Sequence, residues 1–487
     1  MKDLHTFSAK KLRDLFLKGD LSAETITKHF LSRIQTHNKR LGAFLKVFDE
    51  KSQKQARALD KKRSAGKPLG KLAGIPIGIK DNTHIQGEIT TCASKFLEHY
   101  RAPFSASVVR FMEEEDALFL GKLNLDEFSM GSSNENSAYM NAHNPWNTAC
   151  TPGGSSGGSA AAVSARLVPM ATGSDTGGSI RQPAAFCGIV GFKPTYGRVS
   201  RYGLVAFGSS LDQIGPLASS VEDAALMMET IGRPCSHDPT TLSLPADSYL
   251  DASITDLKGK VIGVPWSFLN NLQTTSQKNF QTSIDTLKDL GAKIEEVDLS
   301  LLRYSIAVYY ILATAEASTN LSRFDGIRYG TRSASGSSFE EIYQKSRNEG
   351  FGDEVKKRIL LGTFVLSAGH QDEFYRKAQK MRYLIQKSFN EAFAKCDYVV
   401  MPTSPVSAFP LNSFQDPFDM YLQDILSIPA NLACLPAVSV PAGFDEKNMP
   451  LSLQILGPQC HDSLVLQAAH AFEKATPYKH RIPEAFA

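Results

Sequence analysis

The sequence predicts an α/β protein with a mainly parallel or mixed central β-sheet. Short apolar runs of strand length alternate with segments whose apolar residues recur at helical spacing. No internal repeat, low-complexity tract or linker rich in Pro, Gly and Ser divides the chain. With 487 residues, of which 42% are hydrophobic and 21% charged, the chain can bury an extensive core. We therefore expect one large domain.

The first predicted elements lead up to Lys80. Residues 21–34 space their apolar side chains as a helix does. Residues 75–79 form a short apolar run that predicts a buried strand ending on Lys80. A helix that ends near Glu115 and a strand over residues 117–120 are expected next.

The second half of the chain continues the alternation. Residues 261–264, 276–291 and 293–299 predict a strand, a helix and a second strand, which together resemble a βαβ unit. A helix that ends near Lys395 leads into an apolar, strand-like segment at residues 397–405. This order favours a sheet with helices between its strands.

Composition and charge give no sign of a nucleic-acid or membrane-surface protein, because the formal net charge is only +3. The basic stretch Lys51–Lys71 is predicted to be a solvated helix and linker rather than an RNA-binding surface. The N-terminal residues lack the apolar core of a signal peptide, and no apolar run is long enough to span a membrane. We expect the chain to stay in the cytoplasm or an equivalent compartment.

The cysteines and histidines predict neither disulfides nor a metal site. The seven cysteines are odd in number, widely scattered and never arranged as C-x-x-C. We expect them to be free thiols, mostly buried. The eleven histidines contain no H-E-x-x-H pair, so no metal ligand set is predicted.

A loop rich in Gly and Ser runs into an alanine-rich helix at Thr151–Leu167. Such loops before helices often bind phosphate, so a nucleotide site must be considered. The spacing does not match G-x-x-x-x-G-K-[ST], and the stretch Gly66–Lys71 is one residue short of that motif and lacks its Ser or Thr. A nucleotide site is therefore disfavoured.

The segment "GSDTGGSIRQP" presents Ser179 directly after Gly177 and Gly178. The glycines allow a tight turn whose N–H groups converge in front of the serine, as in an oxyanion hole. Arg181 stands where the G-x-S-x-G elbow of the α/β-hydrolases would have its second glycine, so a histidine triad of that kind is not indicated. We expect Arg181 and Asp175 to fix the turn rather than contact a substrate.

A serine nucleophile needs a base, and Lys80 is the remaining candidate. At the end of an apolar strand, desolvation would lower the pKa of this lysine and leave it neutral often enough to accept a proton. If Lys80 cannot reach Ser179 directly, a bridging hydroxyl is available from Ser155 or Ser156. The alternative is an ordinary surface lysine paired with Asp81.

Three segments together resemble the shared pattern of the amidase signature enzymes. They are "GIPIGIKDN", "GGSSGGSAAAV" and "GSDTGGSIRQPAAFCGIVGFKPTYGRVS", which occur in that order and in full. The resemblance implies a Ser-cisSer-Lys relay in which Ser179 is the nucleophile, Ser155 bridges after a cis peptide bond, and Lys80 is the base. It also implies that the N–H groups of Thr176, Gly177 and Gly178 hold the oxyanion.

The same resemblance implies the fold and the division of the chain. An amidase signature fold has a central mixed sheet with helices on both faces, here preceded by an N-terminal helical arm. We expect a single domain over residues 1–487. Within it, residues 1–64 form the arm and basic linker, 65–220 the catalytic core, and 221–487 the rest with the substrate-binding segments.

Further stretches resemble the glutaminase components of the glutamyl/aspartyl-tRNA amidotransferases, over nearly the whole chain. They are residues 124–139, 316–330, 354–367 and 424–443. This resemblance implies a glutaminase that passes ammonia to a partner B subunit, with a small C subunit completing a heterotrimer. ATP and Mg are expected at the B subunit, which would also handle the mischarged Glu-tRNA(Gln) or Asp-tRNA(Asn), and no cofactor is expected on this chain.

Free glutamine carries a carboxylate and an ammonium group, so its site needs a forked cation and an anion. The resemblance implies that Arg358 binds the carboxylate and Asp424 the ammonium group. It also places a tyrosine in the site, with Tyr309 slightly favoured over Tyr310. The alternative is that Arg358 and Asp424 are ordinary charges on helix surfaces.

Two rival functions remain open. The first is a stand-alone amidase with the same relay and an apolar pocket for small or apolar amides. The second is a non-catalytic scaffold that binds RNA through Lys51–Lys71, which the intact Lys80, Ser155 and Ser179 disfavour.

Overall fold

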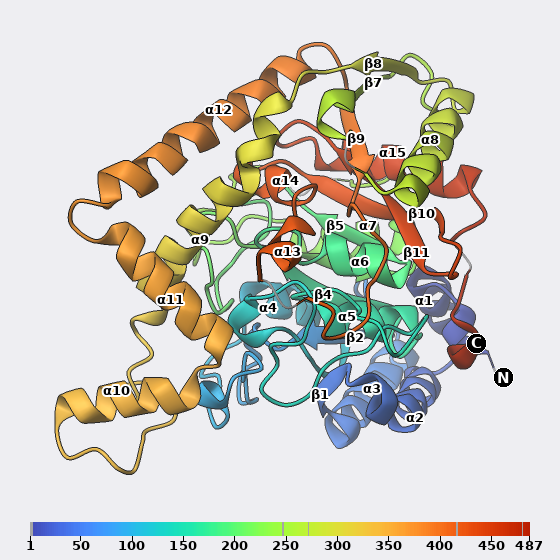
Figure 1. Cartoon of the computed structure of the whole chain (residues 1–487). Helices are drawn as coiled ribbons and strands as arrows, with labels where there is room; N and C mark the ends of the chain where they lie inside the picture. Colours follow the sequence, from blue (N-terminus) through green and yellow to red (C-terminus); the bar gives the residue numbers. More distant parts are fainter. Residues whose placement is uncertain (1–2, 246–247, 271, 415–416, 480) are drawn as a thin grey trace.

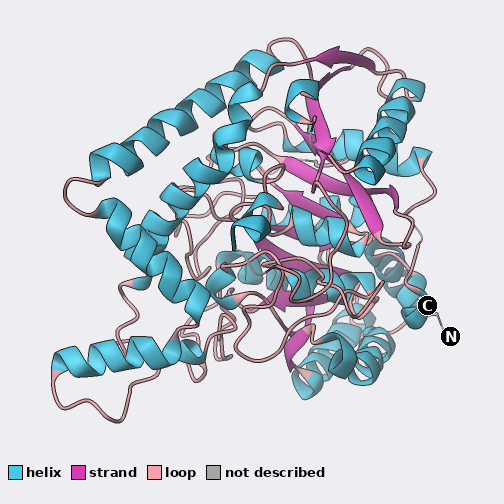
Figure 2. Ribbon diagram, in the orientation of Figure 1, coloured by secondary structure: helices cyan, strands magenta, loops and turns pink. Residues whose placement is uncertain are grey.

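The computed structural model describes residues 3–245, 248–270, 272–414, 417–479 and 481–487. Within these ranges, eleven strands form one mixed sheet (Figure 2) in the order β1-β3-β2-β4-β6-β5-β10-β11-β9-β7-β8. The strands are β1 (Phe44–Val47), β2 (Pro76–Lys80), β3 (Leu118–Leu123), β4 (Met170–Asp175), β5 (Val190–Lys193), β6 (Gln213–Ala218), β7 (Val261–Val264), β8 (Lys293–Glu296), β9 (Tyr398–Pro402), β10 (Ala437–Phe444) and β11 (Pro450–Leu456).

The helices lie before, between and after these strands (Figure 1). They are α1 (Ala9–Lys18), α2 (Ala23–Leu41), α3 (Asp49–Ser64), α4 (Ser107–Glu114), α5 (Gly157–Ser164), α6 (Arg181–Cys187), α7 (Val221–Ile231), α8 (Thr274–Asp289), α9 (Ser305–Leu321), α10 (Phe339–Gly350), α11 (Asp353–Leu366), α12 (Arg376–Phe393), α13 (Pro417–Leu422), α14 (Ile428–Leu432) and α15 (Asp462–Ala475).

Strand β2 lies between β3 and β4 and runs parallel to both. The carboxyl ends of parallel neighbours meet at the same edge of a sheet, so Lys80 and Asp175 end their strands side by side. The neighbouring pairs on either side are antiparallel, β4 with β6 and β3 with β1. The edge where β2 and β4 end is therefore where the catalytic segments gather.

Helices cover both faces of the sheet because its strands alternate their side chains. In β3, Leu118 and Leu120 belong to one core cluster with α1, α2, α5 and α6, whereas Phe119 belongs to another with α4, α7 and α15. The N-terminal helices thus pack into the main body of the protein. The predicted mixed sheet, the helices on both faces and the N-terminal helices are confirmed.

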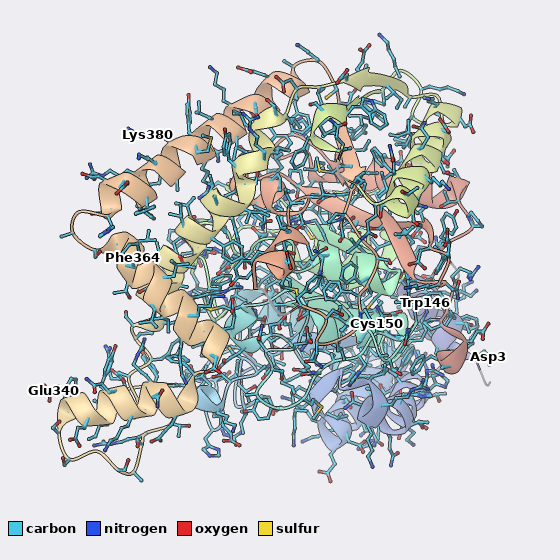
Figure 3. All side chains as sticks on the ribbon, viewed as in Figure 1. Asp3, Trp146, Cys150, Glu340, Phe364 and Lys380 are labelled. Carbon is cyan, nitrogen blue, oxygen red and sulfur yellow. The ribbon has the colours of Figure 1, made fainter. Side chains whose placement is uncertain are left out.

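One side of the molecule is built from α9, α11 and α12, with α10 extending away from it (Figure 1). Both α11 and α12 pack on α9. Figure 3 shows Glu340, Phe364 and Lys380, which belong to α10, α11 and α12, along this outer edge, far from Trp146 and Cys150. These helices carry the predicted residues Tyr309, Tyr310 and Arg358.

The individual elements lie close to their predicted ranges. The strand predicted over 261–264 is β7 with the same bounds, and the one predicted over 75–79 is β2, which includes Lys80. The helix predicted over 21–34 begins two residues later and continues to Leu41, because the capping Gly42 adopts the left-handed conformation that ends it.

The basic stretch Lys51–Lys71 forms most of α3 and the loop after it, as predicted. Lys51, Lys62 and Lys71 pair with Glu88, Asp116 and Glu229, so part of its charge is engaged within the chain. Five of the seven free cysteines are buried, which agrees with the expectation for thiols. None of the helices in the described ranges is long and apolar enough to cross a membrane.

Candidate active site

Lys80 ends β2 with a side chain that is completely buried. Burial lowers the pKa of this amine to about 7, although Asp126, Asp175 and Asp212 act in the opposite direction. A large fraction of Lys80 is therefore neutral near neutral pH. The alternative of a surface lysine paired with Asp81 is wrong, because Asp81 pairs with the buried Lys122 at 2.7 Å instead.

Three serine hydroxyls surround the Lys80 nitrogen. The distances from Nζ to Oγ are 2.8 Å for Ser155, 2.8 Å for Ser156 and 2.9 Å for Ser174. Ser155 and Ser156 are fully buried, and Ser174 is the penultimate residue of β4, the strand that leads to Ser179. The amine is thus held in a dry, hydroxyl-lined site.

The partners of Ser156 and Ser174 bear on the direction of the Lys80 lone pair. The Ser156 hydroxyl donates to the carbonyl of Ser174 at 3.2 Å, so it accepts from the Lys80 amine. The Asn82 amide also donates to Ser174 Oγ at 2.9 Å, which fills one of the two acceptor positions of that oxygen. A neutral amine has two hydrogens, and if Ser156 and Ser174 accept both, its lone pair faces Ser155.

Asp126 supports the loop that carries Ser155. The Gly154–Ser155 peptide bond is cis, and the Asp126 N–H donates to the Ser155 carbonyl at 3.2 Å. The Asp126 carboxylate lies so close to Gly154 that a Cβ there would approach it within 2.1 Å. Only glycine fits at this point of the loop.

Ser179 lies on the turn between β4 and α6 and is partly exposed. Its carbonyl accepts the Ser156 N–H at 3.2 Å, which brings the turn against the relay loop. Its hydroxyl has no hydrogen-bond partner among the described residues. The structure therefore joins Lys80 to Ser155 directly and places the Ser179 turn against the loop that carries Ser155, while no hydrogen bond joins the Ser155 and Ser179 hydroxyls among the described residues.

Asp175 and Arg181 fix the turn. Arg181 Nη2 lies 2.9 Å from Asp175 Oδ1, and both side chains are fully buried. The Asp175 carboxylate also accepts the N–H groups of Gly178 at 2.9 Å and Ile180 at 3.1 Å. Burial alone would raise the pKa of Asp175, but Arg181 and the hydrogen bonds lower it to about 2. These contacts agree with the expected structural role.

The same contacts bear on the predicted oxyanion hole. The Gly178 N–H is already donated to Asp175, whereas the N–H groups of Thr176, Gly177 and Ser179 have no partner among the described residues. The Gly178 part of the prediction therefore has a competing acceptor in this structure. Thr176 and Gly177 stay candidates, and Ser179 itself joins them.

The two glycines of the turn are required by close neighbours. A Cβ at Gly177 would lie 2.7 Å from the Tyr309 ring, and one at Gly178 would lie 2.1 Å from Ser427 Oγ. Gly178 also has a φ of +134°, which other residues rarely adopt. Ser427 Oγ donates to the Gly177 carbonyl at 2.7 Å, so the turn is held from outside as well.

Arg358 lies on α11 and is 4% exposed. Its Nε donates to Glu354 at 2.8 Å, while its two terminal nitrogens have no hydrogen-bond partner among the described residues. Burial alone would lower the pKa of Arg358, but Glu354 raises it, so the side chain stays charged. A buried guanidinium with two free nitrogens suits a carboxylate. The alternative of an ordinary helix-surface charge is wrong.

Asp424 is buried and accepts a hydrogen bond from Ser132. Burial raises the pKa of Asp424 to about 7, against the effects of Ser132 and Arg358. Its carbonyl accepts the N–H of Ser427 at 3.0 Å, which connects it to the turn at Gly177. It too is not an ordinary surface charge.

Tyr309 and Tyr310 occupy different positions. The Tyr309 ring lies against Gly177, and Arg358 and Asp424 both act on its hydroxyl electrostatically. Tyr310 stacks on Tyr421 with ring centroids 4.0 Å apart and lies 5.4 Å from the Arg358 guanidinium. The tyrosine favoured from the sequence is thus the one beside the Ser179 turn.

The sequence did not reveal several contributors to this site. Asn82 lies two residues beyond Lys80, just after the end of β2, and its polar side chain there could have indicated a second contributor to the site. Ser174 could be identified only with the knowledge that β2 and β4 are neighbours. Nothing in the sequence relates Ser427 to a turn some 250 positions away.

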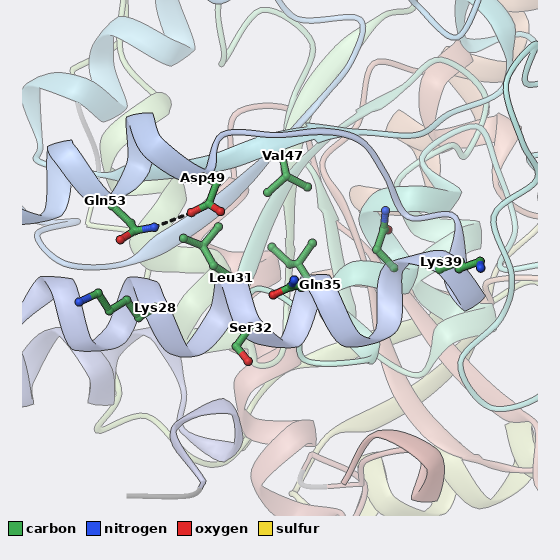
Figure 4. A pocket seen from close by; sticks show the side chains of 10 residues that line it. Lys28, Leu31, Ser32, Gln35, Lys39, Val47, Asp49 and Gln53 are labelled. Atoms are coloured by element: carbon green, nitrogen blue, oxygen red, sulfur yellow. Dashed lines mark hydrogen bonds between the residues drawn. The ribbon is translucent and has the colours of Figure 1, made fainter.

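A separate groove of about 550 Å³ lies between α2, α3 and β1 (Figure 4). Leu31 and Val47 line it, and Gln53 donates to Asp49 at one end. None of the predicted site residues lines this groove.

Comparison with known proteins agrees with this geometry. The family model described as "Amidase" matches residues 25–466. The chain belongs to the amidase family.

Within that family, the chain is similar over its full length to proteins named as the A subunit of glutamyl-tRNA(Gln) amidotransferase. The protein from Protochlamydia amoebophila is 58% identical over 99% of this chain and 98% of its own length. The protein from Chlamydia felis is 51% identical over 98% and 97%.

Solved structures show the same relationship. The crystal structure of the A subunit of glutamyl-tRNA(Gln) amidotransferase from Thermotoga maritima aligns with a TM-score of 0.82 and 41% identity, over 99% of this chain and 98% of that one. A bacterial aryl acylamidase of the amidase signature family aligns with a TM-score of 0.86 over 99% of each chain. At 24% identity, the latter shows the fold alone.

Proposed function

We propose that this chain is the glutaminase subunit of a tRNA-dependent amidotransferase. The observation that carries the proposal is the buried pair of Arg358 and Asp424 beside the Ser179 turn. Arg358 offers two unpartnered nitrogens to a carboxylate, and Asp424 offers an anion to an ammonium group. Together they match the charged end of free glutamine, with its amide directed at Ser179.

In the first step, Ser179 Oγ attacks the side-chain amide carbon of glutamine. Ser155 takes the proton of Ser179 while Lys80 takes that of Ser155, so the positive charge comes to rest on the lysine. The free N–H groups of Thr176, Gly177 and Ser179 stabilise the oxyanion of the tetrahedral intermediate.

Collapse of that intermediate breaks the carbon–nitrogen bond, and the proton returns through Ser155 to the leaving nitrogen, which departs as ammonia. Ser179 then carries a γ-glutamyl ester. Water, deprotonated through the same relay, attacks the ester, and glutamate leaves with Ser179 restored. Gly178 contributes by shaping the turn.

The names of the relatives support the further proposal that the chain works in a complex. In this proposal, B and C subunits complete a heterotrimer, and the B subunit binds ATP and Mg and uses ammonia to amidate a mischarged tRNA. The same names favour Glu-tRNA(Gln) as the acceptor. Such a complex would work in the cytoplasm, where aminoacyl-tRNA is used.

A stand-alone amidase for small or apolar amides is the alternative. Its pocket would have no use for a buried Arg358 with two free terminal nitrogens or for a buried Asp424, since burying polar groups without partners is costly. The same relay, however, would serve both reactions, so only the substrate separates them.

The test is ammonia release from glutamine by the chain alone and together with candidate B and C subunits. ATP and mischarged tRNA are added, and the Ser179→Ala variant provides the blank. Release that increases with partners and acceptor supports the proposal. Hydrolysis of apolar amides with no activity on glutamine would overturn it in favour of the stand-alone amidase.

A further inference from the structure

A buried carboxylate outside the relay holds the start of the helix that carries Arg358. Glu127 is 2% exposed, and its Oε2 accepts the N–H of Gly352 at 2.8 Å. Gly352 is the N-cap of α11, and as a glycine it offers no capping side chain of its own. Arg358 follows six residues later, about 9 Å along the helix.

Two further residues, Ser94 and Phe351, hold the junction between α10 and α11. Ser94 donates to the other Glu127 oxygen and lies 3.2 Å from the Gly350 carbonyl, so it connects both sides of the junction. Phe351 packs against Phe96 with ring centroids 4.6 Å apart. The Phe351 contact stabilises the junction by apolar packing. Among the described residues, only Glu127 accepts a hydrogen bond from the backbone N–H of the N-cap residue, Gly352.

Glu127 is also the immediate neighbour of Asp126, whose N–H holds the Ser155 carbonyl. One dipeptide therefore touches the relay loop on one side and the α11 N-terminus on the other. Gly352 has room for this contact only because it lacks a side chain, since a Cβ there would lie 2.4 Å from Glu127 Oε2.

We propose that Glu127 is a positioning residue for substrate binding, which sets Arg358 by anchoring the N-terminus of α11. The proposal rests on the proposed function, because it assigns Arg358 to the carboxylate of glutamine. Glu127 touches neither glutamine nor the reacting atoms. Its loss should therefore weaken glutamine binding more than it slows the chemical step.

The conservative variant is accommodated by the same contacts. In Glu127→Gln, the amide oxygen can still accept the Gly352 N–H. The amide nitrogen can donate to Ser94 Oγ, whose hydrogen then turns to the Gly350 carbonyl. Glu127→Ala keeps neither bond, and both variants remove the negative charge, so the pair separates the effect of the hydrogen bonds from that of the charge.

The test is steady-state glutaminase kinetics of the full chain in its complex. We expect Glu127→Ala to raise KM for glutamine about fivefold to tenfold, with kcat within about twofold of the wild type. Glu127→Gln should restore KM. In a Ser179→Ala background, Glu127→Ala should raise the glutamine Kd by a similar factor, measured by calorimetry without turnover.

Glu473→Ala is the matched control. Glu473 is also a buried glutamate that accepts a helix N-terminal N–H, that of Val221 in α7 at 2.9 Å. Because α7 carries none of the site residues, this variant should lower Tm and leave KM unchanged.

Gly352→Ala tests the same contact from its other side and replaces Glu127→Ala if that variant does not fold. The added methyl must displace the Glu127 carboxylate, so KM should rise here too. A wild-type KM in both Glu127→Ala and Gly352→Ala, or an equal rise in Glu473→Ala, overturns the proposal. A wild-type chain that does not hydrolyse glutamine would instead refute the proposed function.

Discussion

Lys80 Nζ lies 2.8 Å from Ser155 Oγ at the end of β2, where neither side chain is exposed to solvent. This contact makes a neutral lysine useful as a base, because Ser155 can pass on a proton from a nucleophile that Lys80 does not touch.

Replacing Lys80 by Ala should lower kcat for glutamine hydrolysis about 10²-fold to 10⁴-fold and leave KM nearly unchanged. The physical reason is that Lys80 is the only hydrogen-bond partner of the Ser155 hydroxyl among the described residues. Lys193→Met is a suitable control, since Lys193 is also buried and, among the described residues, its amine donates only to the Pro194 carbonyl. It should lower Tm but keep kcat, and a Lys80→Ala enzyme with normal kcat would remove lysine from the mechanism.

The two neighbouring serines should differ sharply in their contribution. Ser155→Ala removes the bridge to Ser179 and should cost about 10³-fold in kcat. Ser156→Ala removes only an acceptor for Lys80, because its own hydrogen is committed to the Ser174 carbonyl, and should cost about tenfold. Single-turnover rates of acyl-enzyme formation would measure both, and equal losses would contradict the assigned direction of the proton path.

The reaction should have a rising pH profile. The Lys80 pKa of about 7 means that the neutral, active base forms as the pH increases through that value. We therefore expect kcat to rise with a midpoint near pH 7 and to level off about one pH unit above it. Asp424 also has a pKa of about 7 and binds the substrate ammonium only when ionised, so it adds to the rise in kcat/KM.

The variant Asp424→Asn separates these two groups. It should raise KM while the midpoint of the kcat profile stays near pH 7. If the midpoint of kcat moved with this substitution, Lys80 would not be the group that titrates.

Arg358→Ala should weaken glutamine binding by about 2 to 5 kcal/mol, the usual cost of truncating one partner of a buried charge contact. Arg358→Lys should recover only part of this, because lysine lacks the forked geometry. Arg376 on α12 provides a matched control, since it pairs with Asp372 at the same i,i+4 spacing but lies exposed. Unchanged affinity in Arg358→Ala would contradict glutamine as the substrate.

Gly178→Ala should inactivate the enzyme without unfolding it. The residue has a φ of +134° and Ser427 packs directly against it, so a methyl group must shift the Ser179 turn. Loss of activity with a Tm decrease of only a few degrees is the expected result. Ser427→Gly in the same chain should recover some activity by making room.

The sequence was informative where chemistry and local pattern coincide. The strand that ends at Lys80 and the tight turn at Gly177 and Gly178 could be predicted, because each depends on residues next to one another in the chain. The order of the strands could not, since β10 enters the sheet beside β5, far away in sequence. That long-range order is what brings Ser427 to Gly177.

The direction in which an individual backbone N–H group points could not be predicted from the sequence either. The sequence favoured Gly178 as an oxyanion donor, but its N–H turns to Asp175, whose carboxylate is itself fixed by Arg181 and Asn431. A backbone N–H has one direction, and here that direction is set by Asp175, whose carboxylate is held by the nearby Arg181 and by Asn431 from a distant segment.

Helix α5, which follows the relay serines, has no exposed residue from Gly157 to Ser164. With solvent on no side, its amide hydrogens can exchange with deuterium only through openings large enough to separate it from β4 and α6. Such openings would also pull Ser155 away from Lys80. The protection of α5 in hydrogen exchange would thus report directly on the fraction of molecules whose relay is assembled.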